Sequence, residues 1–299
     1  RSSAMLRSFA ISLTVLASTA AWSGTACPQH FATGTPPAIV NPKLLPRTQE
    51  VCFEAFVVLH SGLSRTPLYA AEHLTRADLV LAKKLSREDS FHAETALPPQ
   101  DRAELKDYVR SGYDRGHMAP NANFANRTAQ AESFSLANMV PQVHANNAGV
   151  WADLEAAART LAMNEGEAYV VSGPVFVGSD IKKIGGRVLV PTHLWKVVYS
   201  PRQQRAGAYL ITNDETRDYT AMSVSALQKF AGINPLPGLP QPVLDGGLEL
   251  PKMQAASGNR SKEPGAAMPS TQPTPQDDGF NLRDYSRAIL EAIERLGKK

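Results

Sequence analysis

The residues best suited to catalysis are concentrated in one octapeptide, which runs from Tyr113 to Pro120. Its centre, Asp114-Arg115-Gly116-His117, places a carboxylate, a guanidinium and an imidazole within four positions. A neutral imidazole, with an unperturbed pKa of ~6.5, can take a proton from water near neutral pH. A given tetrapeptide occurs by chance in roughly one chain of this length in 500. The stretch therefore contains residue types that could carry acid–base chemistry, although His117 taken alone could equally be a structural histidine.

A second group of polar residues follows at helical spacing. Asn147, Trp151, Glu155 and Arg159 are four residues apart, and positions four apart on a helix form one row. The helix expected over residues 146–163 therefore carries an amide, an indole, a carboxylate and a guanidinium on one face. Glu155 and Arg159 form an i,i+4 pair whatever else they do.

These segments resemble the DNA/RNA non-specific endonucleases, the ββα-metal nucleases that include endonuclease G. The resemblance covers about residues 51–231. It is carried by Asp114-Arg115-Gly116-His117, Asn138, Pro141-Gln142, Asn147, Trp151, Leu154-Glu155, Ser172-Gly173-Pro174, Val190-Pro191-Thr192-His193 and Lys196. It implies an α+β fold, a mixed domain with a central antiparallel sheet. The ββα-metal catalytic element would consist of a strand ending in His117, a second strand, and a helix that brings the metal ligand.

The resemblance also implies roles for the matching residues. His117 would be the general base that activates water, Asn147 the direct ligand of Mg²⁺ (with Mn²⁺ as an alternative ion), and Glu155 the partner of a water on the metal. Asp114 and Arg115 would support catalysis, and Asn138 would contact the substrate. Arg159, on the same helix row as Asn147, is a further candidate for substrate contact. The implied reaction is hydrolysis of phosphodiester bonds in DNA and RNA without regard to sugar or sequence.

One family feature is missing where the alignment expects it. Some members carry a catalytic Arg on the strand before the motif, whereas the corresponding segment here, residues 71–75, places His73 at that position. The phosphate charge would then be held by Arg115, Arg159 or Arg76.

Other interpretations stay open at this point. Asp114 and Arg115 could form a plain salt bridge. The whole chain could be a catalytically decayed nucleic-acid-binding or DNA-uptake protein on the same scaffold, but that interpretation favours loss of His117 or Asn147, and both are present. A third candidate is a phosphodiesterase that acts on small nucleotides or lipid head groups.

The overall charge gives no support to nucleic-acid binding. The net charge is +3, but residues 51–232 contain 19 Lys and Arg against 19 Asp and Glu. The excess lies in the first 50 residues. Any basic surface that binds DNA or RNA must therefore be local and arranged by the fold.

The N-terminal residues are typical of a secretory signal peptide, expected over residues 1–26. Arg7 is followed by an apolar run from Phe9 to Ala21 and then by small residues. The run is shorter than the ~20 residues that span a bilayer, and a buried N-terminal helix is the alternative. The mature protein would be secreted or periplasmic, without stable membrane association after cleavage.

Cys27 and Cys52 are the only cysteines. Two cysteines in an exported chain favour one disulfide, with two separate thiols as the alternative. No CxxC or paired Cys/His cluster points to structural zinc.

Residues 27–233 are expected to form the endonuclease domain. Apolar runs and helical spacing within it predict strands over 51–59, 68–74, 133–140, 168–172, 187–190, 194–199 and 208–212, and helices over 100–109, 146–163 and 223–230. The composition of residues 234–279 predicts a Pro-rich, disordered linker. An amphipathic helix is expected over 280–299, either docked on the core or used for self-association, so a homodimer is one outcome.

Overall fold

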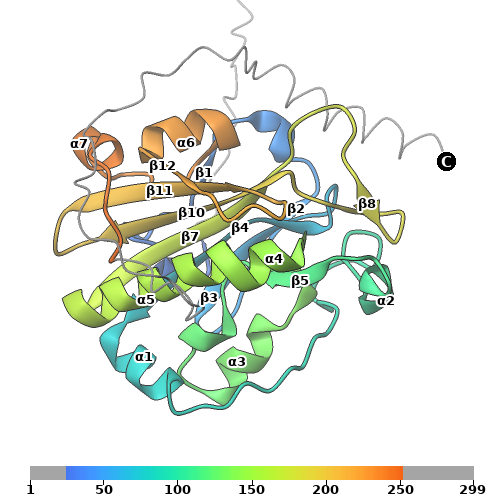
Figure 1. Cartoon of the computed structure of the whole chain (residues 1–299), viewed down its shortest axis with the longest axis horizontal. Helices are drawn as coiled ribbons and strands as arrows, with labels where there is room; N and C mark the ends of the chain where they lie inside the picture. The colour runs from blue at the N-terminus through green and yellow to red at the C-terminus, as the bar shows by residue number, and fades with distance from the viewer. Residues whose placement is uncertain (1–24, 252–299) are drawn as a thin grey trace, which may run out of the picture.

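The computed structural model describes residues 25–251, and its centre is a seven-stranded antiparallel sheet (Figure 1). Across the sheet the strands follow the order β12, β11, β10, β7, β4, β3 and β2. Their bounds, in the same order, are Thr220–Met222, Arg205–Thr212, His193–Ser200, Glu167–Val175, Thr66–Thr75, Phe56–Ser61 and Thr48–Cys52. The predicted α+β class with a central antiparallel sheet is confirmed.

Both faces of this sheet are buried. Neighbouring side chains of a strand point to opposite faces, and on β7 Val171 enters one hydrophobic core while Val170 enters the other. Helices cover the two cores in Figure 1, with α1 (Arg76–Ala82) and α5 (Ala152–Glu165) on one face and α6 (Val224–Ala231) and α7 (Gln241–Asp245) on the other. Within residues 25–251 no helix has the length and apolar content needed to cross a membrane.

The segment that carries the motif connects two neighbouring strands. β4 and β7 are paired, with Thr75 opposite Glu167. Just beyond this pair, Arg76 N donates a hydrogen bond to Gly166 O at 2.8 Å. Residues 76–166 therefore leave the sheet and rejoin it at one point.

This inserted segment contains the predicted ββα element. Its parts are β5 (Asp114–His117), β6 (Met139–Gln142), α4 (His144–Asn146), the π-helical turn η5 (Asn147–Trp151) and α5. Gly149 has non-helical backbone angles, φ −110° and ψ −114°, and marks a kink. The helix predicted over 146–163 is thus present, but it begins with a π turn, a feature that often lies at functional sites.

The shorter elements complete the domain. The helical turns are η1 (Pro28–His30), η2 (Pro42–Leu44), α2 (Leu105–Tyr108), η3 (Asn121–Asn123), α3 (Arg127–Ser133) and η4 (Leu136–Asn138). Two small ribbons pair β1 (Ala38–Ile39) with β13 (Ile233–Asn234), and β8 (Lys183–Ile184) with β9 (Val188–Leu189).

The single strand predicted over residues 51–59 is wrong. The segment forms a hairpin of β2 and β3, closed by a hydrogen bond from Phe53 N to Phe56 O at 2.9 Å. The turn contains neither Gly nor Pro, so the sequence carried no signal that would interrupt the run.

Two further predicted elements are shorter than expected. In the segment predicted as a strand over 133–140, Ser133 is the last residue of α3 and residues 136–138 form η4. Only Met139 and Val140 belong to β6. The helix predicted over 100–109 is reduced to the four residues of α2. Leu105 and Val109, its expected apolar face, are both exposed, so no burial stabilises a longer helix.

The folded domain also extends beyond the predicted boundary at residue 233. Asn234 pairs in the β1–β13 ribbon, and α7 packs on the core near α6. Leu236, Val243, Leu244 and Leu248 are buried. Isolated apolar residues between prolines give no regular period, which is why composition indicated a linker here. The rest of that linker, the helix predicted over 280–299 and all but the last two residues of the predicted signal peptide lie outside the described residues.

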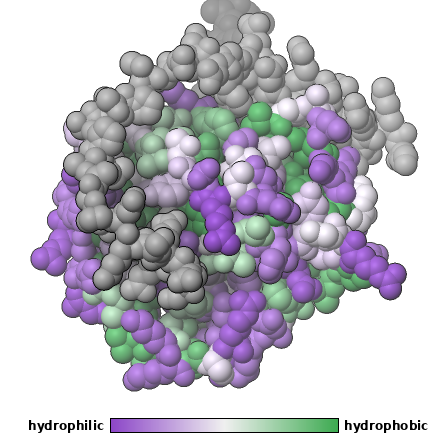
Figure 2. Space-filling view, in the orientation of Figure 1, coloured by the Kyte–Doolittle hydropathy of each residue, from purple (hydrophilic) through white to green (hydrophobic). Residues whose placement is uncertain are grey.

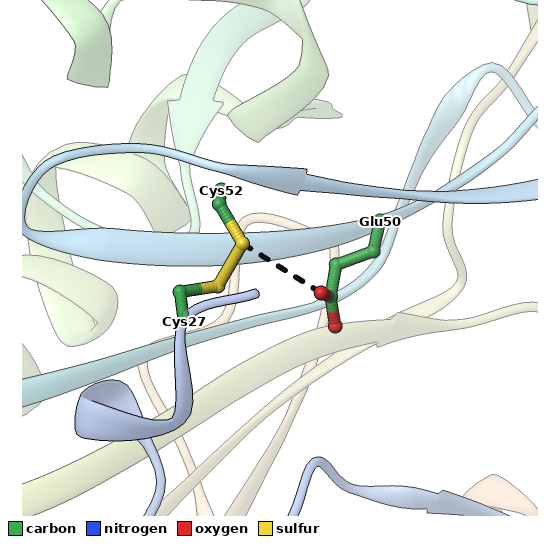
Figure 3. A group of neighbouring side chains, drawn as sticks. All are labelled: Cys27, Glu50 and Cys52. Atoms are coloured by element: carbon green, nitrogen blue, oxygen red, sulfur yellow. Dashed lines mark hydrogen bonds between the residues drawn. A yellow bond between two sulfur atoms is a disulfide. The ribbon is translucent and has the colours of Figure 1, made fainter. Parts of the chain in front are cut away.

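A disulfide joins Cys27 to Cys52 and fastens the N-terminal segment to the edge strand β2 (Figure 3). The two Cα atoms are 6.0 Å apart, and the bond closes a 25-residue separation, worth ~3 kcal/mol in the chain-entropy model. Glu50 Oε1 lies 3.6 Å from Cys52 Sγ. Cysteine and glutamate side chains can bind metal ions, but the two sulfur atoms are bonded to each other and cannot form the thiolates that ligate a metal.

Candidate active site

β5 and β6 form the two-stranded part of the catalytic element. Their register places Asp114 opposite Gln142. A Cβ at Gly116 would overlap with the side chain of Gln142, so only glycine fits at this position of the motif. Gln142 is buried and donates from Nε2 to Asn146 Oδ1 at 2.6 Å. The glycine therefore lets β5 pack against the residue that anchors the start of the helix.

Asp114 orients the amide of Asn147. Its Oδ2 accepts a hydrogen bond from Asn147 Nδ2 at 3.0 Å and pairs with Nδ1 of the exposed His144 at 2.8 Å. The carboxylate engages the amide nitrogen, so Asn147 Oδ1 is left available. Among the described residues, Asp114 forms no salt bridge with Arg115, so the plain ion pair considered from the sequence is not present.

His117 is a buried imidazole, 8% exposed, with an unused nitrogen. The ring of Phe134 packs edge-on against the imidazole, with 5.0 Å between the ring centres. Trp151 Nε1 donates a hydrogen bond of 3.0 Å to the backbone carbonyl of His117. Within residues 25–251 its Nε2 finds no hydrogen-bond partner. Burial, helped by the guanidinium of Arg87, lowers the pKa of His117 to about 3. The ring is therefore neutral at neutral pH and can accept a proton.

A cavity of about 460 Å³ adjoins this element, and Asp114, Arg115 and Asn147 all line it. The guanidinium of Arg115 lies 4.1 Å from the centre of the Phe91 ring. Stacking on an aromatic face holds a guanidinium in place while leaving its N–H groups free for a phosphate. The cavity thus brings a carboxylate, a guanidinium and an amide oxygen to one wall.

Arg87, which the sequence analysis did not single out, lines the same cavity. Its side chain is 53% exposed, lies over the Phe134 ring at 5.2 Å and pairs through Nε with Asp89 at 2.5 Å. This residue supplies an upstream guanidinium beside His117. It stands in an irregular loop after α1, so no strand or helix pattern could have located it.

His73, which the alignment put at the position of the family's upstream Arg, lies elsewhere. Its Nε2 pairs with Glu167 at 2.7 Å, and its ring stacks on Tyr169 at 4.1 Å. Arg76 donates to two backbone carbonyls at the end of α5. Arg76 thus uses two of its donors within the fold, and the phosphate role considered for it stays a prediction.

Glu155 lies one turn beyond Trp151, in a cluster of charges. Burial raises its pKa, and the ammonium of Lys196 and the guanidinium of Arg159 act in the opposite direction. Arg159 in turn donates from Nη1 to Asn123 Oδ1 at 3.1 Å. The predicted row along the helix is thus formed, with Trp151 buried between the cavity and the charges.

Two charges in this cluster are buried in the sheet, Glu72 on β4 and Lys196 on β10, which are 2% and 1% exposed. Lys196 Nζ donates to Ser172 Oγ at 2.7 Å and lies 4.3 Å from the centre of the Trp151 ring. Glu72 accepts from Asn123 Nδ2 at 2.9 Å. Burial raises the pKa of Glu72 to about 7, against the effect of Lys196. Glu72 was missed from the sequence, although an ionisable residue in an apolar strand run is a recognisable signal.

Asn138 is fully buried, and its side chain makes only internal contacts. Oδ1 accepts from Ala119 N at 2.9 Å, and Nδ2 donates to the carbonyls of Ala119 and Ser133 at 2.8 and 2.9 Å. Asn138 thus holds the loop that directly follows His117, and the substrate contact predicted for it stays a prediction.

The cavity wall fits a hard cation held by few protein atoms. Asn147 offers one amide oxygen there, and the volume leaves room for the waters that Mg²⁺ retains. Within the described part of the chain, the only group of three His, Cys, Asp or Glu side chains close enough to share an ion is the one at the disulfide. The site is therefore suited to a cation completed by water and substrate oxygens rather than by a cage of carboxylates.

Comparison with known proteins agrees with this geometry. The sequence profile of the DNA/RNA non-specific endonuclease family matches residues 37–241. A nuclease of Syncephalastrum racemosum is 33% identical over 205 residues, which cover 60% of this chain and 64% of that protein. The mitochondrial nuclease EXOG of Danio rerio is 36% identical over 173 residues, covering 52% of this chain and 50% of its own. The chain thus matches about half to two thirds of each relative's length.

The fold comparison gives the same result. The crystal structure of the EndoG/EndoGI complex contains a chain that matches with a TM-score of 0.55 and 27% identity, over 62% of this chain and 84% of that one. The profile match covers more than half of the sequence and includes the whole ββα element. This chain belongs to the DNA/RNA non-specific endonuclease family.

Proposed function

We propose that this protein hydrolyses phosphodiester bonds within DNA and RNA, with Mg²⁺ as its ion and Mn²⁺ as an alternative. One relationship carries the proposal. A single ββα element holds a buried, neutral imidazole whose Nε2 is unused and an amide oxygen that Asp114 leaves available. A buried polar atom without a partner costs about 1–3 kcal/mol, and such an atom is expected where a substrate or a reacting water completes the site.

His117 acts as the general base in this proposal. The imidazole nitrogen takes a proton from water as the water oxygen forms its bond to phosphorus and the bond to the leaving oxygen breaks. The low pKa of the buried ring keeps it unprotonated before the reaction. It also drives the ring to give the proton up afterwards, so that the leaving oxygen or solvent receives it.

Arg115 and Arg87 hold the phosphate. Both line the cavity beside Asn147, and both are steadied by an aromatic ring. Guanidinium groups bind phosphate oxygens in a fixed fork geometry. An ion on Asn147 would neutralise charge that develops on the phosphate and the leaving oxygen. Glu155 would accept a hydrogen bond from a water of the site, and the cations of the buried cluster favour its charged form.

The same geometry accounts for a lack of specificity. The cavity groups that carry the proposal address phosphate oxygens, which DNA and RNA share, and phosphate contacts contain no sequence information. Attack by water does not require the ribose 2′-OH as a nucleophile. We therefore expect cleavage without strong preference for sugar or sequence.

Export is a further part of the proposal. A disulfide between Cys27 and Cys52 supports folding in an oxidising compartment, which agrees with a secreted or periplasmic protein. Mass spectrometry of protein recovered from culture medium and periplasm would locate the mature N-terminus.

A plasmid-nicking assay tests the activity. Wild-type protein should convert supercoiled plasmid to nicked and linear forms with Mg²⁺ and should stop in excess chelator. His117→Ala should lose ~10²–10⁴-fold of the rate and still retard plasmid in a gel. His92→Ala, which alters an exposed imidazole bonded to the Ser90 carbonyl, is the matched control. Retardation without any nicking would instead indicate a binding or DNA-uptake protein. An intact plasmid with hydrolysed small nucleotide diesters would indicate a phosphodiesterase.

A further inference from the structure

A second cavity, of about 740 Å³, lies beside the first, and Arg87 lines both. Its walls come from α1, η3, α3 and α5. We call it the α1/α5 cavity. Nothing in the proposed chemistry uses it, although it is larger than the cavity that contains Asn147.

The wall of the α1/α5 cavity is apolar with polar groups at intervals. Leu79 and Ala82 of α1 are buried and contribute apolar surface, and Met163 of α5 adds more. Gln130 and Asn164 also line it, and Gln130 Oε1 accepts a hydrogen bond from Arg127 Nη1 at 2.9 Å. Val80 and Leu81, between Leu79 and Ala82 of α1, are exposed, and in Figure 2 hydrophobic surface reaches the solvent at the lower left, where Figure 1 places α1. Such a mixture suits a ligand that is flat and largely apolar but has polar edges.

The position of this cavity relates it to the reacting centre. The guanidinium of Arg87 lies over the ring of Phe134, which packs against His117. Nη1 of Arg87 donates a hydrogen bond of 3.4 Å to Oδ1 of Asn121, which lines the second cavity. Arg159 lines the second cavity as well. The row on the helix therefore begins at Asn147, which lines the first cavity, and reaches Arg159, which lines the second. Arg87 and Arg159 thus supply two guanidinium groups to the second cavity.

We propose that the α1/α5 cavity receives an unpaired nucleoside that adjoins the scissile phosphate. The inference rests on the proposed nuclease function and extends it. The apolar wall takes the base, the amides of Gln130 and Asn164 meet its edge, and Arg87 and Arg159 meet the phosphates on either side. Gln130, whose Oε1 is taken by Arg127, can donate to a base, and the Asn164 amide can both donate and accept, so these contacts tolerate more than one base. Arg87 uses Nε and Nη1 within the protein, for Asp89 and Asn121, and Arg159 uses Nη1 for Asn123, so each guanidinium keeps further N–H groups for a phosphate.

Strand preference follows from this arrangement. A base stacked in a duplex cannot enter a cavity unless it is unpaired and flipped out, at a cost of a few kcal/mol. Unpaired segments of DNA or RNA should therefore be cut faster than the same sequence in a duplex, while the choice of sugar and base stays broad.

The cavity can be closed from two walls without changing a residue of the catalytic site. Ala156 on α5 and Ala122 on η3 are both exposed and line it. Ala156→Trp and Ala122→Trp should each lower kcat/KM on a single-stranded oligothymidine by about tenfold, the scale of one lost base contact. Both should narrow the difference between single-stranded and duplex substrate. Ala226→Trp is the matched control, because Ala226 is an exposed helix residue on α6, on the opposite face of the sheet.

Cross-linking provides a second measurement that does not depend on these variants folding. The His117→Ala protein with Mg²⁺ would be mixed with oligothymidine that contains one 4-thiothymidine, illuminated and digested. Cross-links should fall in peptides that contain residues 79–85 or 156–164. Cross-links only elsewhere, or wild-type rates in both folded cavity variants, overturn the proposal. If wild-type protein fails to cut any nucleic acid but still cross-links at these peptides, the nuclease function fails and the binding site stands.

Discussion

Nδ2 of Asn147 donates a hydrogen bond of 3.0 Å to Oδ2 of Asp114, so the first residue of the motif fixes the amide at the start of the following helix. The two side chains come from different elements of the ββα unit, β5 and η5. Their contact engages the amide nitrogen and leaves the amide oxygen available, as the proposed role of Asn147 in holding a metal ion requires.

Asp114→Ala should therefore weaken metal binding while leaving the fold intact. Without the carboxylate the amide can rotate, and loss of a residue that orients a ligand typically reduces metal affinity ~10–100-fold. Calorimetric titration with Mn²⁺ measures this directly. His144→Ala removes the other partner of Asp114, at an exposed position, and should bind Mn²⁺ nearly as wild type does. Equal affinities in the Asp114→Ala and wild-type proteins would show that Asp114 does not orient the ligand.

The buried imidazole predicts how stability depends on pH. The pKa of His117 is about 3 in the folded protein, against 6.5 for an ordinary histidine. Between these two pH values the unfolded chain binds a proton that the folded chain does not. The free energy of unfolding is therefore unaffected by this group above pH 6.5 and decreases as the pH falls from 6.5 toward 3. In metal-free buffer, His117→Asn should remove this loss. Wild-type melting temperature should fall more steeply than that of the variant between pH 6.5 and about pH 4, and parallel curves would contradict the assignment.

The buried charges Glu72 and Lys196 predict the opposite pH dependence. The loss of stability caused by Lys196→Met should grow as the pH rises. Lys196→Met removes the ammonium whose charge lowers the pKa of Glu72, and a buried charge left uncompensated typically costs about 3–5 kcal/mol. Burial already raises the pKa of Glu72 to about 7 from 4.5, so its charge, and the penalty for burying it, grow as the pH rises through that value. Urea unfolding should show a larger loss at pH 8 than at pH 5. Lys196→Met combined with Glu72→Gln should recover part of the stability, and no recovery would mean that the two residues are not coupled.

The C-terminal boundary of the domain can be tested by truncation. A chain that ends after Pro251 should be folded and active, whereas one that ends after Ile233 should be insoluble or strongly destabilised. The shorter chain lacks four buried residues, Leu236, Val243, Leu244 and Leu248, each worth ~1.5–3 kcal/mol by burial. That sum is comparable to the whole stability of a domain, ~5–15 kcal/mol. A stable, active 233-residue product would place α7 outside the cooperative core.

What the sequence could predict here depended on regular spacing. The central strands and the helix row at 147, 151, 155 and 159 follow simple periods, and the structure contains them. The paired cysteines were equally readable because only two exist. Arg87 could not be found this way, because its contact with the site depends on the path of an irregular loop.

Burial was the second quantity that the sequence did not reveal. Asn138 looked like a substrate contact because it is polar and lies near the motif, but it is fully enclosed and bonded to the chain. Trp151 was expected on a polar row and is buried with its N–H bonded to His117 O. Which face of a helix meets the sheet follows from tertiary packing, and residue type alone does not decide it.

The junction at Arg76 and Gly166 bears on how such enzymes can diversify. Because the inserted segment leaves and rejoins the sheet between two hydrogen-bonded strands, it is topologically a long β-hairpin loop. The entropic cost of closing a loop grows only slowly with its length, so insertions and deletions there need not disturb the strand register. Glu72 and Lys196 are the charges of the sheet that reach into the inserted segment. In the course of evolution the catalytic residues of the inserted segment could be replaced together, provided that positions 72 and 196 changed with them.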